Sequence, residues 1–146
     1  MTQEEKELLL KDLSARLTYG VMCSIKGHEE KYWDSNFERY ITNSIDKPVR
    51  ITGISIDKDC IELDSLGISE VYGSDDFGGL KPYLRPISRM TEEEKSNYHN
   101  YRYWIEKGDI EHCTINMIDW LNAHYFDYRG LIEKGLAIEA PEGMYK

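Results

Sequence analysis

The chain has 146 residues, which is long enough to bury a hydrophobic core without metals or disulfides, and one domain is the expected organisation. With 40% hydrophobic residues, 31% charged residues, 11 Gly and 4 Pro, the composition excludes collagen-like, low-complexity and wholly disordered chains. The net charge of −9 argues against general nucleic-acid binding, because phosphate backbones repel such a chain.

The first 18 residues predict a helix. Thr2 caps it, and Glu5 three residues later completes a capping box. Leucines then recur at helical spacing and form one apolar face, which must be buried against the domain or against a partner. This start lacks a cationic region and a long apolar run, so we expect no signal peptide, no membrane span and a cytoplasmic location.

Residues 19–90 predict a β-rich part with four or five short strands. Apolar residues alternate with polar ones at 21–25 and again at 49–56, where the phase shifts at Gly53 as a β-bulge would produce. A polar turn then leads into a second alternating run at 60–64. These two runs are typical of a β-hairpin.

The rest of this part is less regular. Residues 28–46 are polar but rich in aromatics, which indicates an ordered excursion with a short helical turn that folds back on the core. A further short strand is expected at 68–72, followed by a loop at 74–79. Two prolines in the segment 80–87 favour an extended edge strand there.

The remaining residues predict three helices. The first begins at Thr91, where Glu94 occupies the capping-box position and acidic residues fill the first turn. Glycines end the first and third helices. The three are expected at 91–107, after Thr114, and at about 128–134.

Strands and helices are therefore segregated along the chain, which predicts an α+β fold. We expect an N-terminal helix, then a small curved antiparallel sheet or SH3-like barrel of four or five strands, then three C-terminal helices. The whole chain, residues 1–146, is interpreted as a single domain. Its parts are an N-terminal helix at 1–18, a β-rich part at 19–90 and a helical part at 91–146.

No motif of known chemistry stands out. The sequence has no P-loop, dinucleotide-binding, HExxH or GxSxG pattern. Cys113 beside His112, with His99 and His124 elsewhere, is the most reactive-looking group, but its members lack ligand spacing. The acidic turn at 57–59 lacks the calcium-binding loop pattern, and the three cysteines show no CxxC. We therefore assign no catalytic, cofactor or metal-binding residue.

The aromatic residues are more informative. Eleven Tyr and three Trp are present, and these residue types dominate interface hot spots and stack on bases or sugars. Three groups are candidates for an interaction surface, although an ordinary structural role is more typical of each. They are the stripe of Tyr98, Tyr101 and Trp104; the cluster of Tyr32 and Trp33 with Phe37 and Tyr40; and Tyr83 with Arg85, near Lys81 and Arg89.

Three stretches of the chain also carry a resemblance. They are Leu80–Glu94 (LKPYLRPISRMTEEE), Leu13–Val21, and the run from Asp119 to Ala137. Together they resemble a group of uncharacterised small proteins of gut Bacteroidetes genomes, often in prophages and other mobile elements. The resemblance implies a bacterial cytosol and an accessory role, and it carries no activity and no site residue.

Three functions follow as hypotheses. The first is a non-catalytic protein-interaction module that binds an unidentified protein partner. We expect it to need no cofactor and to contact no membrane, and a homo-oligomer is compatible with it. The second is an acidic phage-type factor that binds a basic host protein or mimics nucleic acid, since residues 61–80 carry five acids and no base. The third is an enzyme with an unrecognised site that uses Cys113 or a histidine.

Overall fold

The computed structural model describes residues 1–25, 29–44, 48–55, 60–65, 68–72 and 79–145. The chain divides into two compact units, Met1–Pro82 and Tyr83–Lys146, and we describe each by itself. Both helices and strands are present, which confirms the α+β class. The expectation of one domain over the whole chain stays a prediction.

The first unit begins with helix α1 (Gln3–Arg16), and the predicted capping box is present. The Glu5 N–H donates to Thr2 Oγ1 at 3.2 Å, and the Thr2 N–H donates to the Glu5 carboxylate at 2.7 Å. Leu9 and Leu13 are buried, so the leucine face belongs to the interior of the described structure. A single 3-10 turn, η1 (Leu17–Tyr19), follows α1.

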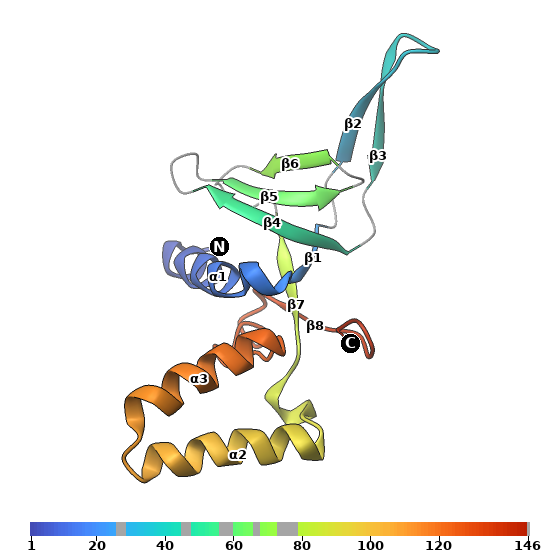
Figure 1. The fold of residues 1–146 in the computed structure, drawn as a ribbon. Helices are drawn as coiled ribbons and strands as arrows, with labels where there is room; N and C mark the ends of the chain where they lie inside the picture. The colour runs from blue at the N-terminus through green and yellow to red at the C-terminus, as the bar shows by residue number, and fades with distance from the viewer. Residues whose placement is uncertain (26–28, 45–47, 56–59, 66–67, 73–78, 146) are drawn as a thin grey trace. The chain divides into compact units, whose positions relative to one another are not determined.

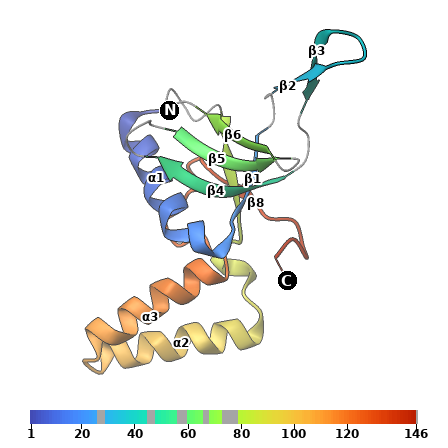
Figure 2. The ribbon, with the colours of Figure 1, turned by 45° about the horizontal axis from the view of Figure 1, so that its top comes forward.

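Helix α1 lies beside the sheet of the first unit (Figures 1 and 2). Within this unit the strand order is β6-β5-β4-β1-β7, and each pair of neighbouring strands is antiparallel. Buried side chains of β1 and β4 contribute to the core. The strands are β1 (Met22–Ser24), β4 (Val49–Ser55), β5 (Cys60–Ser65), β6 (Ile68–Tyr72) and β7 (Lys81–Leu84).

Several β predictions are confirmed. The register between β4 and β5 shifts between Ile51 and Gly53, which is the expected bulge. The β4–β5 hairpin and the short strand β6 are also present, while the predicted turn at 57–59 and most of the loop at 74–79 lie outside the described residues. The barrel alternative is wrong: among the described strands β6 pairs only with β5, so the sheet stays open.

In the excursion predicted at 28–46, residues 29–44 form a second hairpin. The prediction of a short helical turn there is wrong. Strands β2 (Glu29–Asp34) and β3 (Arg39–Ser44) pair with each other in antiparallel register. At the connection the Asn36 N–H donates to the Asp34 carboxylate at 2.9 Å, a local bond that favours a turn. In the described part of the chain these strands pair with no other strand.

Strand β7 is extended as predicted, but it is not an edge strand. Its first two residues, in the first unit, pair antiparallel with β1. Its last two, in the second unit, pair in parallel with the short strand β8 (Ile138–Glu139). Because β8 comes from a distant part of the sequence, local patterning gave no sign of this second neighbour.

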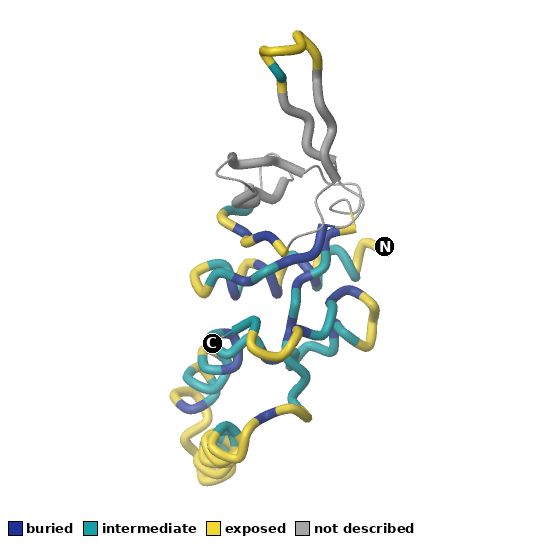
Figure 3. Tube along the Cα trace, turned by 90° about the vertical axis from the view of Figure 1, so that its right-hand side faces the viewer, coloured by how far each residue is buried: buried dark blue, intermediate teal, exposed yellow. Residues whose placement is uncertain are grey.

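The second unit is mainly helical. After the 3-10 turn η3 (Ile87–Arg89), helices α2 (Glu92–Glu106) and α3 (Ile110–Ala123) run side by side (Figures 1 and 2). Met90, Leu121 and Phe126 form the buried cluster of this unit. Helix α2 has no buried residue and most of it is exposed (Figure 3).

Two helix predictions for this unit are corrected. Helix α3 begins at Ile110 rather than after Thr114, directly beyond the break at Gly108. The third helix, expected at 128–134, is a series of turns, so α2 and α3 are the α-helices described after residue 90. Gly130 has a positive φ of 71°, a left-handed conformation that interrupts a right-handed helix.

Candidate functional site

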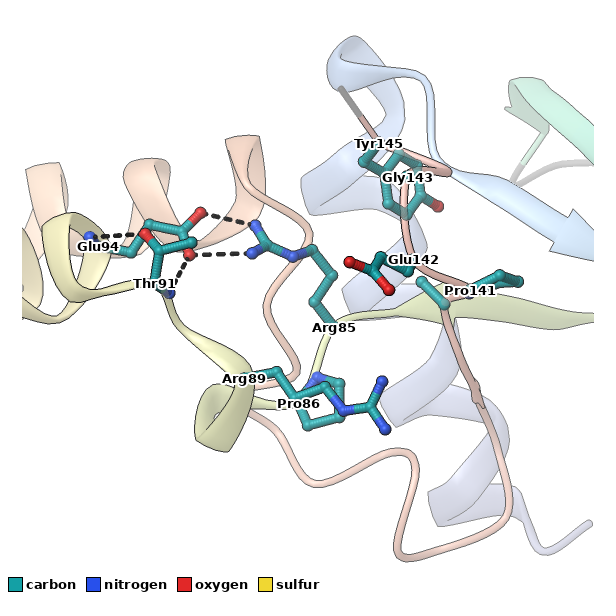
Figure 4. Close-up of a pocket in the computed structure, with 10 residues that line it drawn as sticks. Arg85, Pro86, Arg89, Thr91, Glu94, Pro141, Glu142, Gly143 and Tyr145 are labelled. Carbon is teal, nitrogen blue, oxygen red and sulfur yellow. Dashed lines mark hydrogen bonds and ion pairs between the residues drawn. The ribbon is translucent and has the colours of Figure 1, made fainter.

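A cavity of about 640 Å³ lies in the second unit beside the first turn of α2. Three segments line it: the residues that follow β7, the start of α2, and the segment 140–145 (Figure 4). Its charged lining residues are Arg85, Arg89, Glu94 and Glu142, two of each sign. A cavity of this size falls within the range of small-molecule sites, and its charged lining makes it the candidate site of this unit.

Arg85 ties the first turn of α2 to the end of α3. Its Nη1 and Nη2 donate to the two carboxylate oxygens of Glu94, each at 2.9 Å, and Nη1 also donates to the His124 carbonyl at 3.3 Å. The guanidinium lies 4.3 Å from the centre of the Phe126 ring. With these contacts made, we infer that Arg85 mainly holds this wall of the cavity in place.

Glu94 is the other half of this tie. Besides its bonds to Arg85, its carboxylate accepts the Thr91 N–H at 2.8 Å, which completes the predicted capping box of α2. The hydrogen bond from Arg85 lowers the pKa of Glu94, partial burial opposes this shift, and the Thr91 N–H adds to the lowering. The carboxylate is thus held ionised at neutral pH.

The opposite wall is the segment 140–145. The Ala140 N–H donates to the Leu84 carbonyl at 2.7 Å, and the Tyr145 hydroxyl donates to the Tyr83 carbonyl at 2.8 Å. The Tyr145 ring stacks on Tyr125 with centroids 3.6 Å apart and planes 11° from parallel. Tyr125 has a positive φ of 61°, a strained conformation for a residue with a side chain, which surrounding contacts must hold.

The structure brings only part of the group predicted around Arg85 to the cavity. Arg85 and Arg89 both line the cavity, and Arg89 forms an ion pair of 2.6 Å with Glu139 at the surface. Tyr83 is half-buried and contributes its backbone carbonyl to the wall. Lys81 lies in the first unit, paired with β1.

The predicted stripe on α2 divides in two. Tyr98 packs against the buried cluster of the unit, and the Tyr101 ring lies 6.1 Å from the Trp120 ring, so both are half-buried. Trp104 is 49% exposed and meets the 51% exposed Tyr103 edge to face, with centroids 5.4 Å apart. The predicted stripe followed a spacing of three to four residues, so it included Trp104 but not Tyr103, the preceding residue.

The predicted aromatic cluster of the first unit lies on the β2–β3 hairpin. Trp33, near the end of β2, is 53% exposed, and Phe37 in the connection is 67% exposed. The Arg39 guanidinium lies 5.1 Å from the Phe37 ring centre. Tyr32 and Tyr40 occupy β2 and β3, where Tyr40 is the register partner of Trp33.

The thiols of Cys23 and Cys113 both have raised pKa values. Burial raises the pKa of Cys113, and the thiol donates to Asp109 Oδ2 at 3.3 Å, which raises it further. Burial also raises the pKa of Cys23 well above its usual value, with the Asp12 charge as the second cause. Within the described ranges, no group of three or more His, Cys, Asp or Glu side chains could hold a metal ion.

Sequence reasoning missed one charged pair. Arg16 and Asp12 form an ion pair inside the structure, with two hydrogen bonds of 2.8 and 3.0 Å and both side chains 0% exposed. A signal was present, since opposite charges four residues apart fall on the same helix face as Leu9 and Leu13. Because of its leucines, that face was predicted to be apolar, and the charged pair on it was not predicted.

No helix in the described residues is long and apolar enough to cross a membrane. Comparisons of the chain with protein-family models, with curated proteins and with solved structures give no match.

Proposed function

We propose that this protein is a small non-catalytic protein-interaction module. The observation that carries the proposal is the Tyr103–Trp104 pair, two large aromatic side chains that touch each other and remain about half exposed on α2. Tyr and Trp side chains dominate the energetics of protein interfaces, because they bury much apolar area at a small entropic cost. An exposed aromatic pair of this kind supports contact with a protein partner.

The β2–β3 hairpin supports the same proposal independently. A two-stranded hairpin is marginally stable by itself in water, and this one pairs with no further strand among the described residues. It nevertheless carries Trp33 and Phe37 at its exposed end. Burial of these side chains against a partner would stabilise both the hairpin and the complex.

The test is site-specific photo-crosslinking in a lysate of cells that express the protein. A photoreactive phenylalanine analogue at position 104 should yield a discrete adduct. The same analogue at exposed Lys95, which lies two and a half turns earlier on the opposite side of α2, should not. Excess unlabelled wild-type protein should suppress the adduct, and a Tyr103→Ala/Trp104→Ala competitor should not. Absence of an adduct at positions 104 and 33, or equal suppression by both competitors, would refute the proposal.

The acidic-factor hypothesis differs from this proposal in its response to salt. The acids of residues 61–80 have side chains outside the described part of the chain, so that hypothesis stays a prediction. Aromatic contacts persist in roughly 1 M NaCl, where the Debye length is about 3 Å, whereas contacts between an acidic chain and a basic partner are screened. Loss of the adduct in high salt would therefore favour the acidic factor.

A further inference from the structure

The cavity in the second unit carries an inference of its own. We propose that it binds a small zwitterion, a molecule that bears both an ammonium and a carboxylate group, such as a free amino acid or a short peptide. The inference uses none of the exposed aromatic residues on which the proposed function rests. It therefore stands or falls separately from that function.

The charged residues of the lining fall into two kinds. Of the four charged residues there, Arg85 and Glu94 bind each other through two hydrogen bonds of 2.9 Å. Both are largely buried, so this pair is a fixed part of the wall. What remains is one cation, Arg89, and one anion, Glu142.

Both remaining groups are accessible to a ligand. Arg89 pairs with Glu139 through one nitrogen, Nη2, and its side chain is 64% exposed. A guanidinium has five N–H donors, so donors remain for a ligand. A ligand carboxylate can therefore bind the guanidinium beside Glu139. Glu142 is exposed and has no hydrogen-bond or ion-pair partner within residues 79–145, and Figure 4 shows its carboxylate turned toward Arg85.

The balance of charges narrows the ligand class. A polyanion such as a phosphate ester would meet the carboxylates of Glu94 and Glu142, and a simple cation would meet the two arginines. A ligand with one charge of each sign satisfies Arg89 and Glu142 together. Pro86 and Pro141 add apolar walls, which suit an aliphatic side chain between the two charges.

The experiment is an NMR titration of the full chain with L-alanyl-L-alanine. We expect saturable shifts of the Gly143 amide, which lines the cavity, and no shift at Gly108, which lies in the α2–α3 connection. N-acetyl-alanyl-alanine and alanyl-alaninamide, which each lack one charge, should bind about tenfold more weakly, the factor that one lost charge-assisted hydrogen bond produces. Free L-alanine in the same series decides between an amino acid and a peptide as the ligand.

Two variants assign the charges. Arg89→Ala and Glu142→Gln should each weaken binding of the dipeptide by about tenfold, and exposure of both side chains keeps the fold intact. Arg102→Ala and Glu106→Gln, exposed residues of α2 outside the cavity, are the matched controls and should bind like the wild type. No saturable shift up to about 10 mM ligand, equal binding of the capped forms, or unchanged binding by both cavity variants would overturn the inference.

Discussion

Replacing Arg16 with methionine should destabilise the protein far more than replacing both members of its ion pair. Arg16 Nε and Nη2 donate to the two carboxylate oxygens of Asp12, and both side chains are fully buried. Methionine keeps an unbranched chain in the same space but removes both donors. The Asp12 carboxylate then loses two charge-assisted hydrogen bonds while it stays buried.

The magnitude follows from burial. Breaking a buried ion pair by removing one partner costs about 3–5 kcal/mol, a large fraction of the roughly 5–15 kcal/mol that stabilises an ordinary domain. The double variant Asp12→Leu/Arg16→Met removes both charges, and such apolar replacements are commonly neutral or stabilising. We therefore expect its free energy of unfolding to lie within about 1 kcal/mol of the wild type, or above it.

Urea unfolding followed by far-UV circular dichroism measures these free energies, and constant m-values across the series would show that only stability has changed. Lys11→Met, an exposed lysine on the same helix, is the matched control and should change little. A loss below about 1 kcal/mol for Arg16→Met would refute the reasoning. So would a double variant that is as unstable as the single one.

Two further predictions concern the second unit. Glu94→Gln should lower the free energy of unfolding by about 1–2 kcal/mol at neutral pH, because a charge-assisted tie to Arg85 is lost. The folded pKa of Glu94 lies below its unfolded value, so this contribution is present above the unfolded pKa and disappears as the pH falls through the folded one. Urea unfolding at several pH values should show the variant and the wild type converge in acid, with exposed Glu93→Gln as control; a gap independent of pH would contradict this. Alkylation of Cys113 by iodoacetamide, followed by peptide mass spectrometry, should be slower than for a cysteine in an unfolded peptide, because its raised pKa leaves little thiolate. Asp109→Asn should restore part of the rate, and a Cys113 that reacts faster than the peptide would instead favour the enzyme hypothesis.

Local patterns were enough where a feature depends on neighbours in the sequence. The capping boxes at Thr2 and Thr91 were predictable because the cap and its partner lie three residues apart. The bulge at Gly53 was predictable because a shift of register moves alternating side chains to the other face. The third helix was wrongly predicted because Gly130, inside its expected range, has a left-handed conformation that breaks a helix.

The candidate cavity lay beyond such patterns. Its lining comes from residues 85–94 and from the segment 140–145, and only tertiary contacts bring these together. The sequence singled out Arg85 as one of three basic residues in a short run, but its bidentate bond to Glu94 showed that it supports the wall. Glu142, the anion of the proposed zwitterion site, had no local signal among the chain's acidic residues.

By itself, the sequence determined the α+β class, α1 and the start of α2, and the β4–β5 hairpin, because these depend on periodicity and capping over a few residues. The tertiary structure decided which aromatic side chains stay exposed. Tyr98 and Trp104 share a residue class and a helix, yet one packs against the buried cluster and the other is half exposed. Exposure depends on what packs against each face of a helix, and in α2 those neighbours come from other parts of the chain.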